Sequence, residues 1–229
     1  MMRKSKRYEK LLEVLKDKVQ PMSVEDAIAT LKQFNTTKFD QSVECVMSLG
    51  IDAKQADQLV RGSLSLPKGI GKSFKVIAFC EGELAEQAKA AGAVDAGADD
   101  LVQKVQGGWT DFDVAISTPG MMRLVGRLGR VLGPSGKMPS PKAGTVTDDV
   151  VTAVKEYTAG KQEFRNDAGG NVAMVVGKLS FAEEDLKINI EAFINHIKRV
   201  KPSAAKGTYV KRCVISGTMS PGIEIRVSA

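Results

Sequence analysis

The sequence has one histidine, His196, and three widely spaced cysteines, Cys45, Cys80 and Cys213. A single imidazole without a close cysteine pair excludes the usual zinc spacings, and any Ser-His-Asp or Cys-His mechanism would depend on that one residue. Each cysteine lies in or beside an apolar run typical of a strand, so we expect reduced core residues rather than a disulfide framework. This scarcity disfavours an enzyme, and we expect no metal, no cofactor and no small-molecule substrate.

Long apolar runs and aromatic residues are also scarce. No segment approaches the roughly 18 apolar residues of a membrane helix, and no apolar region of a secretory signal follows the basic N-terminus. We therefore expect a cytoplasmic protein without membrane contact. The sequence holds only 1 Trp, 3 Tyr and 8 Phe, whereas proteins that bind single strands stack bases on several exposed rings. A folded RNA, recognised by its shape, backbone and ribose hydroxyls, fits this composition better.

The length and the charge distribution indicate two domains. The chain has 229 residues, 43% of them hydrophobic, which approaches the upper limit for one core. A Pro/Gly-rich hinge at 66–72 and a second change of character near 158–161 divide it. Residues 68–159 carry 11 basic and 11 acidic side chains, residues 1–67 carry 11 and 9, and residues 160–229 carry 11 and 7. The net charge of +6 therefore belongs to the terminal segments.

Basic side chains gather in three stretches of the sequence. Residues 122–147 and 192–223 each contain several cations and no carboxylate. The third stretch, which has Glu9 as its one acid, contains Arg3, Lys4, Lys6, Arg7 and Lys10. Separate basic clusters suggest a polyanion as partner, although solvated faces of a basic protein would give the same composition.

The terminal segments indicate helices and alternating strands. Residues 4–18 have a polar, basic helical pattern, and a second helix is expected after Ser23, a favourable N-cap. From 39 to 49 apolar and polar residues alternate, which predicts a half-buried strand. The apolar side of this strand comprises Phe39, Val43, Cys45, Met47 and Leu49, with Gln41 as an exception.

The last third of the chain shows the same combination of a helix and alternating strands. Strands are expected near 172–176 and 209–215, separated by a helix that a capping box, Ser180-x-x-Glu183, would open. The apolar face of that helix comprises Leu186, Ile190, Phe193, Ile194 and Ile197. Because the two ends resemble each other, they predict one discontinuous α+β domain built from residues 1–67 and 160–229.

The middle segment alternates strands with helices. Short apolar strands are expected at 74–80 and 112–117, and helices at 83–91, 99–105 and 120–132. Such alternation is typical of a small α/β domain with largely parallel strand pairing. We therefore expect an α/β domain, residues 68–159, inserted into the α+β domain.

Two segments superficially resemble phosphate-binding loops. Gly69-Ile70-Gly71-Lys72-Ser73 contains Gly-Lys-Ser, but Leu66 occupies the place of the first P-loop glycine, and the segment precedes a strand instead of following one. Gly136-Lys137 fails similarly, because Met138 replaces the hydroxyl residue that binds the metal. A nucleotide-dependent enzyme using the inserted domain stays an alternative function, as does a DNA-binding regulator.

Two other segments suit a polyanion. Residues 126–146 combine several glycines and three prolines with four cations, and such a loop presents backbone N–H groups and fixed charges to phosphates. The small and hydroxyl residues of 216–222 allow close approach to a ribose-phosphate backbone, although the segment alone is also an ordinary turn. The lone histidine is expected to be structural. Three acid pairs could in principle coordinate magnesium, but they are expected at helix starts and loop edges, where carboxylates favour the helix dipole. These pairs are Asp99-Asp100, Asp111/Asp113 and Asp148-Asp149.

Several longer motifs follow one another along the chain. They are Lys38-Phe39-Asp40, Val43-Glu44, Asp57-Gln58-Leu59-Val60-Arg61-Gly62, Ser65-Leu66-Pro67, Leu128-Gly129-Arg130-Val131-Leu132-Gly133-Pro134, Pro141-Lys142-Ala143-Gly144-Thr145-Val146, Phe164-Arg165-Asn166-Asp167 and Thr218-Met219. With these motifs the sequence resembles a known family, the family-one protein of the bacterial large ribosomal subunit, which forms part of the mobile stalk beside the tRNA exit site. The resemblance covers essentially the whole chain.

The resemblance implies an RNA-binding ribosomal protein that is not an enzyme. The inserted domain would be Rossmann-like and joined through two hinge strands. The expected partners are 23S ribosomal RNA at the stalk, tRNA leaving the exit site, and the mRNA of the protein's own operon, whose translation it would repress. The protein would be a monomer within the ribosome.

The resemblance also implies which residues contact RNA. The terminal domain would supply most of the affinity through Lys38, Phe39, Glu44, Arg165, Lys178, Ser216, Thr218 and Met219. The inserted domain would add a weaker contact through Arg130, Gly133 and Lys142. Glu44 cannot bind phosphate, so we expect it to accept a hydrogen bond from a ribose hydroxyl or base amine, or to orient a neighbouring cation.

Overall fold

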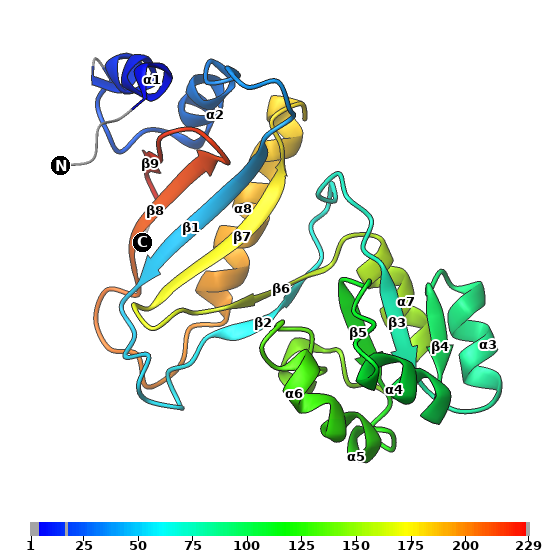
Figure 1. Cartoon of the computed structure of the whole chain (residues 1–229). Helices are drawn as coiled ribbons and strands as arrows, with labels where there is room; N and C mark the ends of the chain where they lie inside the picture. The colour runs from blue at the N-terminus through cyan, green and yellow to red at the C-terminus, as the bar shows by residue number, and fades with distance from the viewer. Residues whose placement is uncertain (1–4, 17, 228–229) are drawn as a thin grey trace. The chain divides into compact units, whose positions relative to one another are not determined.

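The computed structural model describes residues 5–16 and 18–227 of a mixed α/β chain (Figure 1). Arg3 and Lys4, which belong to the basic stretch at the N-terminus, lie outside the described residues. Contacts divide the chain into two compact units. The unit that we call the terminal unit comprises Met1–Val60, Leu66–Gly71 and Phe164–Ala229, and the inserted unit comprises Arg61–Ser65 and Lys72–Glu163.

The terminal unit contains a four-stranded antiparallel sheet in the order β7-β1-β8-β9. Its elements are α1 (Lys6–Lys16), α2 (Val24–Lys32), β1 (Ser42–Leu49), β7 (Asn171–Lys178), α8 (Glu183–Arg199), β8 (Val210–Gly217) and β9 (Ile223–Ile225). The central strand β1 pairs on both sides with strands that follow it by more than a hundred residues. Both sequence ends are therefore needed to complete this sheet.

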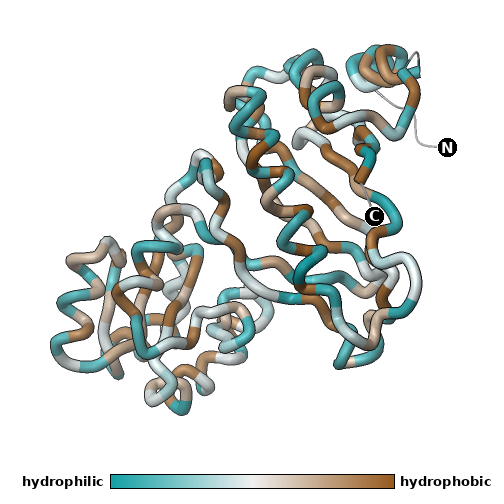
Figure 2. Tube along the Cα trace, turned by 180° about the vertical axis from the view of Figure 1, so that it is seen from behind, coloured by the Kyte–Doolittle hydropathy of each residue, from teal (hydrophilic) through white to brown (hydrophobic). Residues whose placement is uncertain are grey.

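The core of the terminal unit lies between the sheet and its helices. Alternate residues of β1 are buried, as the sequence pattern predicts. The predicted apolar face of α8 is buried as well. Figure 1 shows α8 behind the sheet, and Figure 2, viewed from the opposite side, shows it in front with hydrophobic and hydrophilic residues alternating along it. Cys45 and Cys213 are buried and free, with their Sγ atoms 3.6 Å apart.

The inserted unit is built around a three-stranded parallel sheet in the order β4-β3-β5. Its strands and helices are β2 (Arg61–Leu64), β3 (Val76–Phe79), α3 (Glu83–Ala90), β4 (Asp95–Gly97), α4 (Asp99–Gln106), β5 (Val114–Ser117), α5 (Met122–Val125), α6 (Gly129–Leu132) and α7 (Val150–Thr158), with 3₁₀ turns η1 (Gly126–Leu128) and η2 (Pro141–Ala143). Helices cover both faces of the sheet, which completes three layers.

Strand β3 explains why both faces need cover, because all four of its residues are buried. Val76 and Ala78 point to a core shared with α3 and α7, while Ile77 and Phe79 point to a core shared with α4, α5 and α6. A strand buried on both sides reads as a continuous apolar run, as the sequence did here. The described residues contain no helix with the length and apolar content needed to cross a bilayer.

Two short strands lie where the chain passes from one unit to the other. Strand β2 pairs with β6 (Gln162–Arg165) in a separate two-stranded sheet. Arg61 of β2 donates a hydrogen bond to the Ser140 hydroxyl, which ties β2 to the loop before η2 within the inserted unit.

Two local predictions were wrong. Strand β1 begins at Ser42, so Phe39 lies in the preceding loop with 52% of its surface exposed. The capping box does not form: the N-cap of α8 is Ala182, and the Ser180 hydroxyl donates to Asp40 Oδ2 instead (2.7 Å). The helix expected at 120–132 is present as α5, η1 and α6, and the irregular part of the glycine-rich segment begins after Leu132.

Candidate nucleic-acid interface

The turn after β8 is attached to the start of β1 by a closed set of hydrogen bonds. The Thr218 N–H donates to the Ser42 carbonyl (3.1 Å). In return the Ser42 N–H donates to Thr218 Oγ1 (3.1 Å). Within the turn the Gly217 N–H donates to Ser220 Oγ (2.7 Å). The turn is therefore fixed relative to the strand, while the side chains of Thr218 and Met219 stay exposed.

Sheet register brings further candidate residues to the same end of the sheet. Lys178 lies opposite Ser42, and its Nζ donates to the Ser42 hydroxyl (2.9 Å). Glu44 lies opposite Ser216 on the neighbouring strand. The structure thus gathers candidates from three strands, although Glu44 and Ser216 are 172 residues apart in the sequence. We call this end of the sheet the Ser42 end.

The loop before β1 adds one cation and one ring. Lys38 is exposed, as is more than half of Phe39. The Thr37 hydroxyl donates to the Phe39 carbonyl (2.9 Å), and Asp40 accepts from both the N–H and the hydroxyl of Ser180. These bonds order the loop. With Phe39, Met219 is the other large apolar side chain exposed here (49%), and both can pack on bases or sugars.

Arg165 is exposed but lies away from the Ser42 end. The neighbouring Asn166 bridges to Val172, which pairs with Met47 near the other end of β1. Strand β1 rises about 3.3 Å per residue, so its two ends are roughly 20 Å apart. Arg165 and the Thr218 turn therefore do not belong to one compact cluster.

The inserted unit presents a separate group of cations on the segment from α5 to α6. Arg123, Arg127 and Arg130 are exposed and follow one another at intervals of four and three residues, the spacing that shares a helix face. Lys142 is exposed on η2. None of the ion pairs found in the described part of the chain uses these four side chains, which leaves them available to an anion.

Gly133 ends α6 where a side chain would not fit. A Cβ there would lie 2.5 Å from the carbonyl oxygen of Gly129. The glycine therefore lets the chain leave the helix directly beside Arg130. A glycine is therefore required at position 133 for steric reasons that lie within the inserted unit.

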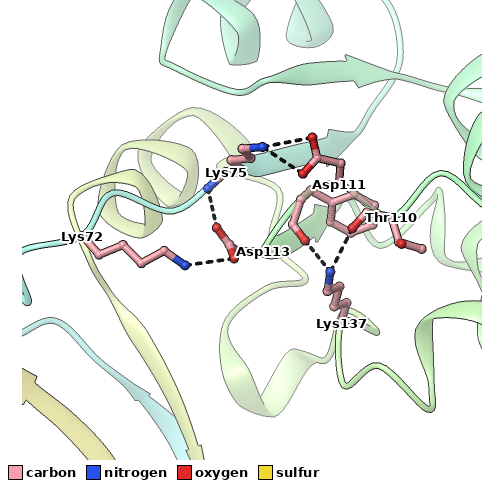
Figure 3. Close-up of polar contacts among 7 residues, drawn as sticks. Lys72, Lys75, Thr110, Asp111, Asp113 and Lys137 are labelled. Carbon is pink, nitrogen blue, oxygen red and sulfur yellow. Dashed lines mark hydrogen bonds and ion pairs between the residues drawn. The ribbon is translucent and has the colours of Figure 1, made fainter. Parts of the chain in front are cut away.

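Lys137 has a different role from the exposed arginines. Its Nζ donates to the carbonyl oxygens of Thr110 (3.0 Å) and Phe112 (2.5 Å), as Figure 3 shows. These bonds anchor the loop after α6 to the segment before β5. Because the ammonium is occupied, Lys137 stabilises the loop rather than facing solvent as a free charge.

The lysines in and just after the segment that resembles a phosphate-binding loop, residues 69–73, form ion pairs within the protein. Lys72 pairs with Asp113 (3.2 Å), and Lys75 with Asp111 (2.8 Å), both visible in Figure 3. A cavity of about 190 Å³ beside them is lined by Lys137 and Lys161, but Lys161 pairs with Glu156 (2.6 Å). Both lysines that line this cavity therefore have bonding partners within the inserted unit.

Carboxylates and the histidine have structural partners. Asp149 is the N-cap of α7 and accepts from the Thr152 N–H, as the acid-pair pattern predicts. His196 packs edge-on against Phe164, with ring centroids 5.4 Å apart. Burial and the nearby Arg199 lower the pKa of this histidine. Among the described residues no group of three or more His, Cys, Asp or Glu side chains is arranged to hold a metal ion.

Sequence reasoning missed the residues that hold the Thr218 turn in place. Ser42 contributes through its backbone, which no side-chain pattern reveals. Gln41 and Arg7 contact the turn through their side chains. The one signal in the sequence was Gln41 itself, a polar residue on the apolar side of the alternating strand.

The sequence was compared with those of known proteins and protein families. Residues 31–221 match the sequence model of the ribosomal protein L1p/L10e family. The chain therefore belongs to this family, and the resemblance inferred from the motifs is confirmed.

Similar proteins carry one common name, large ribosomal subunit protein uL1. The protein of Kosmotoga olearia is 50% identical over 225 residues, which cover 98% of this chain and 97% of the relative. The protein of Lactobacillus delbrueckii subsp. bulgaricus is 55% identical over 203 residues, covering 89% and 88%. A Streptococcus pneumoniae protein is 51% identical over 229 residues, with full coverage of both chains.

Proposed function

We propose that the chain is a structural protein of the large ribosomal subunit in the cytoplasm, and not an enzyme. It binds 23S ribosomal RNA at the mobile stalk as a monomer within the ribosome. It aids release of deacylated tRNA from the exit site, and it represses translation of its own operon by binding the mRNA. Membership of the L1p/L10e family and the names of the relatives support this function.

The observation that carries the RNA-binding proposal is the Ser42 end of the sheet. There an ordered turn presents Thr218 and Met219 beside Lys178, with Phe39 exposed on the adjoining loop. Hydroxyl and backbone groups suit ribose and phosphate, the lysine supplies charge, and the two apolar side chains suit sugar or base faces. Glu44 and Ser216, paired across two strands, extend this surface.

The inserted unit would provide the weaker second contact. Its exposed arginines and Lys142 form a cationic surface without carboxylate partners among the described residues. We infer that this unit is a Rossmann-like domain, residues 68–159, inserted into a discontinuous α+β domain of residues 1–67 and 160–229. Three parallel strands with helices on both faces support that assignment.

Binding to RNA is tested by a salt titration with a stalk fragment of 23S ribosomal RNA. Neutralisation of phosphates predicts that the logarithm of the association constant falls linearly with the logarithm of salt concentration. DNA of the same sequence, which lacks 2′-hydroxyl groups, should compete poorly. A salt-independent interaction, or equal competition by DNA, would contradict the proposal, and thermal stabilisation by ATP or NAD would favour a nucleotide-dependent enzyme.

The two finer roles need their own assays. Ribosomes lacking the protein should release deacylated tRNA from the exit site more slowly and regain speed when it is added back. A reporter carrying the leader of the protein's operon should be translated less when the protein is in excess. Normal tRNA release or an unresponsive reporter would remove the corresponding role and leave RNA binding standing.

A further inference from the structure

Both backbone polar groups of Met219 are held by side chains from distant parts of the chain. The Met219 N–H donates to Gln41 Oε1 (3.0 Å), and the Met219 carbonyl accepts from Arg7 Nη2 (2.9 Å). The residue lies in the exposed turn after β8, where solvent could satisfy both groups. Two side chains nevertheless clamp it, one from helix α1 and one from the loop before β1.

Gln41 makes this contact from a fully buried position. Its exposed fraction is 0%, and its Nε2 donates to the carbonyl of Phe34 (3.2 Å). Its backbone carbonyl accepts from the Leu179 N–H (2.8 Å). A buried amide is stable only with such partners, so its orientation is set by the protein interior. The Oε1 atom is thereby aimed at the turn before any ligand arrives.

Arg7 connects the turn to two other elements. From the half-buried side of α1 its Nη1 donates to Thr36 Oγ1 (3.1 Å), while Nη2 reaches the Met219 carbonyl. The planar guanidinium makes the two bonds at a fixed angle, which a lysine cannot reproduce. Helix α1, the Thr36 loop and the turn are thus joined through one side chain.

We propose that Gln41 and Arg7 are positioning residues that hold the Met219 turn in its RNA-binding conformation. This inference rests on the proposed RNA-binding function and assigns no RNA contact to either residue. With the backbone fixed on both sides, the half-exposed Met219 side chain and the neighbouring Thr218 are preorganised. Ordering them in advance removes an entropic cost that binding would otherwise bear.

The test measures the affinity of the full chain for a stalk fragment of 23S ribosomal RNA. The variants are Gln41→Leu, Gln41→Glu, Arg7→Ala and Arg7→Lys. Lys10→Ala is the matched control, because it removes one charge from an exposed position of the same helix. We expect Gln41→Leu, Arg7→Ala and Arg7→Lys each to weaken binding about 3- to 10-fold, the cost of one or two lost hydrogen bonds. Gln41→Glu keeps an acceptor for the Met219 N–H but replaces the donor to the Phe34 carbonyl with an acceptor oxygen at a buried position, so it too should weaken binding.

Two readouts separate positioning from a direct contact or a general loss of stability. First, the slope of log affinity against log salt should be the same for Arg7→Ala and the wild type. A decrease in magnitude of about 0.9 would show a phosphate contact and overturn the positioning role of Arg7. Second, Gln41→Leu and Arg7→Ala should each cost less in a Met219→Ala background than alone, because they act through that residue. Fully additive losses would contradict the proposal.

Failure of this inference is distinguishable from failure of the proposed function. A wild-type chain that does not bind the RNA fragment overturns the function. Wild-type binding with Gln41 and Arg7 variants equal to Lys10→Ala overturns the positioning roles and leaves the function standing. If Gln41→Leu does not fold, Arg7→Lys decides the question, because it keeps the charge and loses only the two-bond geometry.

Discussion

At the scale of single residues, Thr218 links fold and function most directly. Its hydroxyl accepts from the Ser42 N–H, so Thr218→Ala leaves that group without its partner and loosens the turn. We expect RNA affinity to fall by roughly 1–3 kcal/mol, the range for a lost polar or stacking contact, and Met219→Ala to cost a similar amount. Binding isotherms measure both. Thr208→Ala, an exposed threonine at the far end of the sheet, serves as the control and should bind like the wild type.

Glu44 provides a second test at this scale. It lies opposite Ser216 and is only half-buried, so Glu44→Gln preserves shape and leaves the fold intact. The variant should weaken RNA binding, because a neutral amide is a weaker acceptor for a ribose hydroxyl or base amine than a carboxylate. Melting temperature and affinity are measured on the same preparation. An unchanged affinity would show that Glu44 does not take part.

His196 predicts how stability depends on pH. Burial, followed by the charge of Arg199, lowers the pKa of its imidazole in the folded protein below the usual value of about 6.5. The unfolded chain then binds the proton more readily, so this contribution to stability is complete above pH 6.5 and is lost as pH falls through the folded pKa. Urea unfolding at pH 7.5 and 5.5 should show the decrease. His196→Gln should remove that part of it.

Side-chain periodicity predicted burial in the terminal unit well but said little about hydrogen-bond partners. The alternation in β1 and the apolar face of α8 correspond to buried residues because packing against a common core imposes those periods. The partners of Ser180 and Gln41 come from distant segments. A local pattern such as the capping box therefore lost to a tertiary contact with Asp40.

At the scale of elements, helix α6 and the segment after it carry two kinds of cation: Arg130 is exposed, whereas Lys137 is bonded to backbone carbonyls. Lys137→Met removes two charge-assisted bonds to backbone carbonyls and should lower the free energy of unfolding by roughly 1.5–3 kcal/mol. Arg130→Gln removes an exposed charge and should change stability by less than about 0.5 kcal/mol.

The two variants should rank in the opposite order when their effects on RNA binding are compared. Arg130→Gln should reduce the magnitude of the salt slope by about 0.9, the value for one phosphate contact, whereas Lys137→Met should leave it unchanged. Denaturant titration and salt-dependent binding measure the two quantities independently. If Lys137→Met alone changed the slope, the lysine would be facing RNA despite its carbonyl contacts.

The short elements escaped prediction for a physical reason. Strands β4 and β9 have three residues each, too few for a period to be visible. All four residues of β2 are partly exposed, so no alternation distinguishes it from a loop. The segment from η1 to α6 was expected to be helical even though its glycines favour a loop by propensity, and the fully buried Leu128 and Leu132 hold it in that form.

At the scale of the whole molecule, the expected domains predict the outcome of a deletion. Joining residue 67 to residue 160 through a short Gly/Ser linker removes 68–159. The four-stranded sheet and its helices lie outside the deleted segment, so we expect the remainder to fold cooperatively. It should bind the RNA fragment more weakly than the full chain, because the arginine surface is gone. A chain that unfolds or loses all binding would contradict the proposal that the terminal domain supplies most of the RNA affinity and the inserted domain a weaker contact.

The distribution of charge and the periodicity of apolar residues indicated where the expected domains begin and end. A parallel sheet buried on both faces and an antiparallel sheet covered on one face have different apolar periods. They could not indicate which residues meet at the Ser42 end. That meeting depends on the register of β1 with β7 and β8, which many distributed contacts determine together.

The long-range pairing of β1 has a consequence for protein synthesis. The strand is made early, but its partners β7 and β8 follow only at residues 171–178 and 210–217. A chain growing from its N-terminus can complete the inserted unit first, whereas the Thr218 turn can close on Ser42 only when nearly every codon has been read. A prematurely terminated chain would therefore lack this surface altogether. Under the proposed function, the Thr218 turn would therefore be available to RNA only on finished molecules.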